Sequence, residues 1–199
     1  MSLLRFLAVF ALLGCVAFAS AQAPAVAPAP AETLLRIDRS KSYVDVDVKS
    51  TFDSFTGRLD RYDAKVGVDA NGRVKTAVFA FKFADLKTGN TTRDARMIEW
   101  LGGGDPVGTF SLGVLAIAPD GQGQANGRLT FNGRTERVEF PVLVKRVEDT
   151  FTITGAVTID YRNWGLKVLR LMAVQKVSPD VKIRFQMVGE LPAPAATSE

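Results

Sequence analysis

Alternating apolar and polar residues recur along most of this chain and predict antiparallel strands. Residues 44–49 read VDVDVK, and residues 78–83 read VFAFKF. A period of two places alternate side chains on opposite faces of a strand. Similar stretches, separated by Asn-Gly, Asp-Gly or Glu-Asp dipeptides that favour turns, predict about eight strands. They lie near residues 44–49, 54–69, 74–84, 109–118, 123–132, 137–145, 151–161 and 181–187.

Between the phenylalanine-rich strand and the strand that follows it, the pattern becomes that of a short helix. Thr91 or Thr92 can cap its N-terminus, Asp94 suits the positive end of the helix dipole, and the glycines at 102–104 end it. A narrow apolar stripe, formed by Met97, Ile98 and Leu101, is expected to lie against one end of the sheet. The helix is either a plug that belongs to the core or a gate for a ligand.

Antiparallel strands at hairpin spacing, with one short helix, predict an all-β fold that is either a closed barrel or a sandwich. The strand faces expected to point inward carry side chains that do not ionise. An eight-stranded barrel encloses just enough space for packed side chains or one elongated ligand. The residues alone leave both alternatives open, a packed core or a container for an alkyl or isoprenyl chain.

Both ends of the chain are expected to lie outside the folded domain, which we place at 34–190. Residues 1–21 have the positive charge, apolar run and small-residue site of a secretory signal peptide, with cleavage expected after Ala21. The alternative is a lipoprotein signal in which Cys15 is acylated; only then is membrane contact expected. An alanine- and proline-rich linker is predicted at 22–33 and a flexible tail at 191–199.

Composition narrows the function further. The chain has no histidine, which removes the commonest general base and the commonest zinc ligand. Its formal net charge of +4 is scattered rather than clustered, which argues against nucleic-acid binding. No metal or cofactor is predicted, and a non-enzymatic protein of the periplasm or the exterior is expected. An enzyme that uses carboxylates such as Asp94 is the less favoured alternative.

Four blocks of the sequence, taken in order, resemble the YceI-like family of exported bacterial proteins. They are IDRSKSYVDVDVKS with FTGRL, LKTGNTTRDARM with DPVGTFSL, GRLTFNGRTERVEFPV, and VTIDYRNWGLKV with SPDVKIRFQMVGE. The resemblance implies an eight-stranded, lipocalin-like antiparallel barrel whose interior holds a long amphiphile such as a polyisoprenoid, a fatty acid or a fatty amide. It implies no enzymatic chemistry. The chain departs from the family pattern at 166–177, which is rich in large apolar and basic residues.

Candidate site residues follow from these expectations. The side chains predicted to line the barrel and contact the ligand are Phe79, Phe81, Phe83, Phe110, Phe131, Phe140, Ile159, Phe185 and Met187. The candidates for the ligand head group are Arg93, Asp94, Arg162 and Trp164. The alternative for Arg93 and Asp94 is a structural role, as a helix cap and an ion pair that fix the helix to the barrel. The alternative for Trp164 is packing in the chain corner at 161–165.

Two further alternatives remain open at this stage. A barrel with a fully packed interior would serve adhesion or interaction rather than carriage. A homodimer is compatible with the sequence, since Trp100 is expected to be exposed, but nothing in the sequence requires one.

Overall fold

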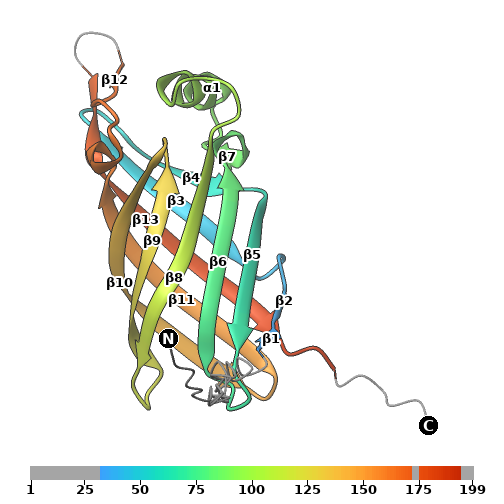
Figure 1. Ribbon diagram of the computed structural model, residues 1–199. Coiled ribbons are helices and arrows are strands. Elements are labelled where there is room, and N and C mark those ends of the chain that lie inside the picture. Colours follow the sequence, from blue (N-terminus) through green and yellow to red (C-terminus); the bar gives the residue numbers. More distant parts are fainter. Residues whose placement is uncertain (1–31, 172–174, 194–199) are drawn as a thin grey trace, which may run out of the picture.

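The computed structural model describes residues 32–171 and 175–193. The predicted signal peptide, nearly all of the predicted linker and most of the predicted tail lie outside the described residues. The described chain forms an all-β structure with one short α-helix, in which a single antiparallel sheet curls around a common interior (Figure 1).

The strands differ greatly in length. Nine described strands have six residues or more: β3 (Tyr43–Ser50), β4 (Ser54–Leu59), β5 (Tyr62–Val68), β6 (Val74–Lys82), β8 (Val107–Ile117), β9 (Gln122–Phe131), β10 (Arg134–Val147), β11 (Thr150–Asp160) and β13 (Gln175–Glu190). Four have two residues: β1 (Thr33–Leu34), β2 (Arg36–Ile37), β7 (Leu86–Lys87) and β12 (Arg170–Leu171). The helical elements are η1 (Phe83–Asp85), α1 (Thr91–Trp100) and η2 (Tyr161–Trp164).

The sheet runs in the order β1-β5-β6-β8-β9-β10-β11-β13-β3-β4-β7, with β2 and β12 paired to β13. Consecutive long strands from β8 to β11 are hairpin neighbours, as the turn dipeptides predict. Among the described residues, no ladder joins the β5 side of the sheet to the β4 side. The expected closed, eight-stranded barrel is therefore corrected to a curled sheet whose hydrogen-bonded ladder stays open.

The described chain has nine long strands where about eight were expected, because the single strand expected at 54–69 is divided into β4 and β5. The chain turns at Asp60 and Arg61, which separates β4 from β5. The Asp60 N–H donates to the Asp85 carbonyl at 3.0 Å, and the Arg61 Nη2 donates to the buried Asp85 carboxylate at 2.7 Å. This corner depends on residues 24 positions away or more, so local alternation could not reveal it.

Two other boundaries also differ from the sequence expectation. The phenylalanine-rich strand ends at Lys82, and Phe83 begins the 3₁₀ turn η1. The helix cap is Asn90 rather than Thr91 or Thr92, because the Asn90 side chain accepts the Arg93 N–H at 3.0 Å. Gly102, Gly103 and Gly104 all have positive φ, which ends α1 as predicted.

The outer faces of β3, β4 and β13 carry a cluster of paired charges. The Arg58 guanidinium donates to both oxygens of Asp45, at 2.7 and 2.9 Å, and Arg184 donates to both oxygens of Asp47, at 2.7 and 3.0 Å. Asp45 is a polar position of the VDVDVK pattern, whose alternation predicts a face exposed to solvent, but Arg58 and its neighbours bury it. The hydrogen bond from Arg184 lowers the pKa of Asp47.

This charge cluster predicts a loss of stability in acid. The pKa of Asp47 is lower in the folded state than in the unfolded state, where it is about 3.9. The ionised carboxylate therefore stabilises the folded protein fully above the unfolded pKa, and this stabilisation is lost as pH falls through the lower folded pKa. Asp47→Asn is expected to lower the free energy of unfolding at pH 7 by about 1 kcal/mol or less. It should also flatten the decline of stability between about pH 5 and 2. Urea titrations at several pH values measure both effects, and an unchanged pH slope would contradict this role.

Candidate functional site

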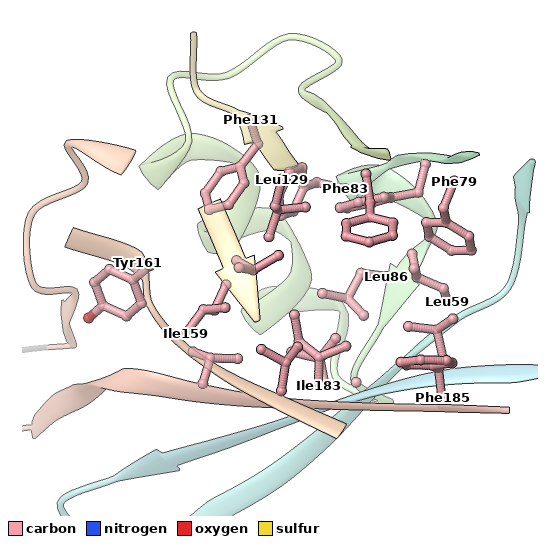
Figure 2. A pocket seen from close by; sticks show the side chains of 18 of the residues that line it. Leu59, Phe79, Phe83, Leu86, Leu129, Phe131, Ile159, Tyr161, Ile183 and Phe185 are labelled. Atoms are coloured by element: carbon pink, nitrogen blue, oxygen red, sulfur yellow. The ribbon is translucent and has the colours of Figure 1, made fainter. Parts of the chain in front are cut away.

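The curled sheet encloses an apolar cavity of about 300 Å³. This volume lies at the lower end of the range of roughly 300–1,000 Å³ found for small-molecule sites. All nine side chains predicted to line the barrel border the cavity. Figure 2 shows Phe79, Phe83 and Phe131 across a gap from Ile159, Ile183 and Phe185. The interior is therefore not completely filled by the side chains of the described residues.

Two rows of aromatic rings form much of the cavity wall. In the first row, the ring centroids of Phe79 and Phe81 are 5.8 Å apart, those of Phe81 and Phe83 are 5.1 Å apart, and Phe83 continues to Phe131 at 5.7 Å. The second row is formed by Phe110, Phe140 and Phe185, with 5.8 Å between successive centroids. Tilted and edge-on contacts of this kind stabilise the rings against each other and fix the shape of the wall.

Glycines on neighbouring strands make room for two of these rings. Gly108 pairs with Phe81, and a Cβ at Gly108 would lie 2.3 Å from the Phe81 ring. Gly155 pairs with Phe185, and a Cβ there would lie 2.6 Å from that ring. The rings thus lie flat over the adjacent strand instead of projecting into the centre. A single sequence shows these glycines but not their partners, so the sequence analysis missed this role.

The end of the cavity far from α1 is closed by packed side chains. Leu35, Val66, Val68, Val74 and Phe151 form a buried cluster there, and Val68 and Phe151 are each only 1% exposed. Figure 1 places the corresponding ends of β5 and β11 opposite the end that carries α1. A ligand chain entering the cavity would therefore end against this cluster.

The opposite end of the cavity lies under α1 and has the polar groups. Thr88, Arg93 and Arg96 border the cavity there, together with Trp100 and Tyr161. The Trp100 Nε1–H donates to the Lys167 carbonyl at 2.8 Å, which ties α1 to the segment after η2. Burial raises the pKa of the Tyr161 hydroxyl. The surface of this cavity is therefore apolar throughout, and the residues that carry polar groups border it at the α1 end.

A second, polar cavity of about 200 Å³ adjoins this end. It is lined by Ser50, Asp53, Phe55, Asn90, Thr92, Arg93 and Arg96. Phe55, Arg93 and Arg96 border both cavities. The Arg93 guanidinium lies 3.8 Å above the centre of the Phe55 ring and 3.8 Å from a carboxylate oxygen of Asp53. Two guanidinium groups therefore stand where the apolar space meets the polar space.

The structure separates the four predicted head-group residues. Arg93 borders both cavities, but Asp94 accepts hydrogen bonds from the Thr88 backbone N–H and hydroxyl at 3.1 and 2.6 Å and borders neither cavity. Arg162 is bound to Asp160 in an exposed pair outside the cavities. Trp164 is 1% exposed, and its ring stacks on Phe131 with centroids 4.6 Å apart. Arg93 is thus the one member of this set that meets the cavity.

Arg96 is a site residue that the sequence analysis missed. It follows Arg93 by three positions and therefore lies on the same side of α1. The helical spacing of Arg93, Arg96, Met97 and Trp100 would have identified this face, which combines two cations with two apolar side chains.

Two kinds of feature were sought among the described residues, a cluster of metal-ligating side chains and a helix of membrane-spanning length. No group of three or more His, Cys, Asp or Glu side chains among these residues is placed to hold a metal ion. The one described α-helix, α1, has ten residues, and no described helix combines the length and apolarity that a membrane crossing requires.

Comparison with known proteins agrees with this architecture. The family model of the YceI-like domain matches residues 35–189. The fold is similar to that of Burkholderia cenocepacia BcnA, with a TM-score of 0.65 and 21% identity over 76% of this chain and 98% of that one. It also resembles a polyisoprenoid binding domain from Saccharophagus degradans implicated in plant cell wall breakdown, with a TM-score of 0.61, 17% identity, and coverage of 81% and 100%.

A third similar structure is the Campylobacter jejuni YCEI protein, with a TM-score of 0.59 and 16% identity over 71% of this chain and 88% of that one. A search of curated protein sequences gave no match.

Proposed function

The chain belongs to the YceI-like family, and on that premise we propose that it is an exported binding or carrier protein for a long-chain amphiphile, such as a polyisoprenoid, a fatty acid or a fatty amide. The observation that carries the proposal is the enclosed apolar cavity of about 300 Å³ with arginines at one end only. The polyisoprenoid binding of the Saccharophagus degradans domain supports a ligand of this class.

The size of the cavity suits the tail of such a ligand. One water needs roughly 10–15 Å³ of comparable space, so about 300 Å³ holds on the order of twenty units the size of water or methylene. Each methylene removed from water contributes about 0.8 kcal/mol. A chain of about ten carbons therefore provides several kcal/mol, from which the cost of ordering the ligand is subtracted. A fully packed adhesion barrel would have no such space.

A non-catalytic role agrees with the residues around the cavity. Among the described residues, those with polar groups that border it carry guanidinium groups, hydroxyls and an indole, and no carboxylate borders it. General acid–base catalysis requires a group that titrates near the working pH, which arginine does not provide. The proposal therefore assigns binding, rather than turnover, to this interior.

The direct test is the content of the protein after expression with its N-terminal segment. Native mass spectrometry followed by organic extraction is expected to show one long-chain amphiphile per chain. The intact mass should also correspond to a mature protein beginning at Gln22, which would support export. An empty protein that also takes up no long-chain lipid on incubation would refute the carrier proposal.

Arg93 and Arg96 are proposed to hold the polar head of the ligand in the second cavity. Because a charge-assisted hydrogen bond is worth about 1.5–3 kcal/mol, Arg93→Ala and Arg96→Ala are each expected to weaken binding of a fatty acid by about tenfold or more. Arg162→Ala is the matched control, since Arg162 pairs with Asp160 outside the cavities. Fluorescent fatty-acid titration measures the affinity, and thermal unfolding tests the fold.

The two measurements distinguish a ligand role from a structural one. If Arg93→Ala unfolded the protein, the stacking of Arg93 on Phe55 and its pairing with Asp53 would be its main role. If all three alanine variants bound equally well with unchanged stability, the head group would lie elsewhere.

A further inference from the structure

Exposed cations and one exposed aromatic ring gather beside the α1 end of the cavity. We call this surface the basic rim and define it as Lys49, Phe52, Lys167, Arg170 and Lys176, all of which are exposed. Phe52 is 71% exposed, at the turn between β3 and β4. A ring that is this exposed contributes little to the core of its own chain.

Hydrogen bonds hold the parts of the rim next to each other. The Thr51 N–H donates to the Lys176 carbonyl at 3.0 Å, and the Lys176 N–H donates to the Thr51 hydroxyl at 3.1 Å. Arg170 pairs directly with Lys176 between β12 and β13. Lys167 is joined to α1 through its carbonyl and the Trp100 indole. Figure 1 shows β12 and α1 at the same end of the sheet.

The charges of the rim are not neutralised within the described chain. None of its four cations forms an ion pair with a described residue, whereas Arg58, Arg61, Arg162 and Arg184 elsewhere each bind an aspartate. Between Asp160 and Asp180 the sequence has no acidic residue. Asp53, next to Phe52, is the acidic residue adjacent to the rim, and it faces Arg93 at 3.8 Å.

We propose that the basic rim docks the protein on an anionic lipid surface, with the α1 end of the cavity directed toward the membrane. Unpaired lysine and arginine side chains are attracted to anionic head groups, each contributing about a fivefold increase in affinity. An exposed phenylalanine among them inserts at the boundary between head groups and acyl chains. Four unpaired cations around a single ring match an anionic lipid surface, which attracts the charges and receives the ring at its interface.

The proposed docking surface lies directly beside residues that border the apolar cavity. Leu169 and Val177, which flank the rim residues Arg170 and Lys176 in sequence, border the apolar cavity. An amphiphile leaving a bilayer under the rim would therefore meet Leu169 and Val177, which stand between the rim and the cavity. Docking on a membrane is a different property from carriage of a ligand, and it can be measured separately, on protein stripped of lipid.

The test is flotation of the lipid-free protein with vesicles of phosphatidylcholine containing about one third phosphatidylglycerol, at about 0.1 M salt. We expect binding that disappears near 1 M salt, where the Debye length falls to about 3 Å, and no binding to pure phosphatidylcholine vesicles. Replacing Lys167, Arg170 and Lys176 by Gln together is expected to weaken binding about 100-fold, from about fivefold per charge. Phe52→Ser should weaken it severalfold.

The matched control removes the same charge from exposed positions outside the rim, by replacing Lys65, Lys145 and Lys182 with Gln. It is expected to change vesicle affinity far less than the rim variant.

Equal losses in the two triple variants would show attraction by net charge alone and overturn the proposal. Two other outcomes would overturn the proposal. The protein could bind neither kind of vesicle, or it could bind a soluble polyanion such as polyglutamate and no vesicle. A protein that docked on anionic vesicles but carried no lipid would refute the carrier proposal and leave docking intact.

Discussion

Val157→Trp is expected to abolish most of the lipid binding while leaving the protein folded. Val157 lies on the inward face of β11, is only partly buried, and borders the cavity. The cavity that Val157 borders has a volume of about 300 Å³, so we expect it to receive the indole, which then fills volume that a ligand chain would occupy. We expect at least a tenfold loss of affinity for a long-chain fatty acid, equivalent to about 1.4 kcal/mol.

The neighbouring residue supplies the control for this experiment. Thr158 lies on the opposite, exposed face of β11, so Thr158→Trp adds the same ring outside the cavity. Fluorescent lipid titration and extraction of co-purified lipid should distinguish the two variants clearly. If both variants retained the full lipid content, the ligand would not occupy the cavity between β11 and the phenylalanine rows.

Trp164→Ala is expected to lower the free energy of unfolding by about 3–5 kcal/mol. The ring is 1% exposed and stacks on Phe131, and its Nε1–H donates to the Leu129 carbonyl at 3.0 Å. Truncation would leave a cavity at the corner formed by η2 and would remove the partner of that carbonyl. In thermal unfolding, a loss of this size corresponds to a decrease in Tm of roughly 10 °C for a domain of this length.

Two further substitutions serve as comparisons, one at the same residue and one at the other tryptophan. Trp164→Phe keeps the stacking on Phe131 but loses the donor to Leu129, and should cost about 1–3 kcal/mol. Trp100→Phe, at a partly buried indole on α1, should cost less than Trp164→Ala. If Trp164→Ala instead reduced lipid binding with no change in Tm, the residue would be a head-group contact and the packing role would be wrong.

The inward faces of the strands could be predicted from sequence because they depend on local alternation. Burial of one strand face imposes the period of two directly, and all nine predicted lining residues border the cavity. The identification of the family from motif order was also confirmed, with a match over 35–189. Arg93, at the start of the helix, borders both cavities, and its contact with a ligand head group stays a prediction.

What the sequence analysis missed depends on contacts between distant residues. The turn that separates β4 from β5 requires Asp85, and the flat position of Phe81 requires Gly108 on the next strand. The alternation rule assigned Asp45 to solvent, because the rule contains no information on the arginine that covers it. Asn90 as helix cap was missed for a different reason, since several adjacent polar residues can serve as caps and only the backbone geometry selects one.

The open ladder between the β4 and β5 sides of the sheet has a consequence for the proposed binding of lipid chains. In a closed barrel, the number of strands and their stagger set the radius, and hydrogen bonds resist any change of girth. Among the described residues, the seam here is bridged by a cluster of side chains that includes Leu59, Tyr62 and Leu86. Hydrogen bonds from Asp60 and Arg61 to Asp85 fix the seam at the turn between β4 and β5, and away from this turn the contacts are between apolar side chains. If the interior holds a lipid as proposed, we expect the girth to be adjustable along this seam, so that chains of different thickness and unsaturation share one interior.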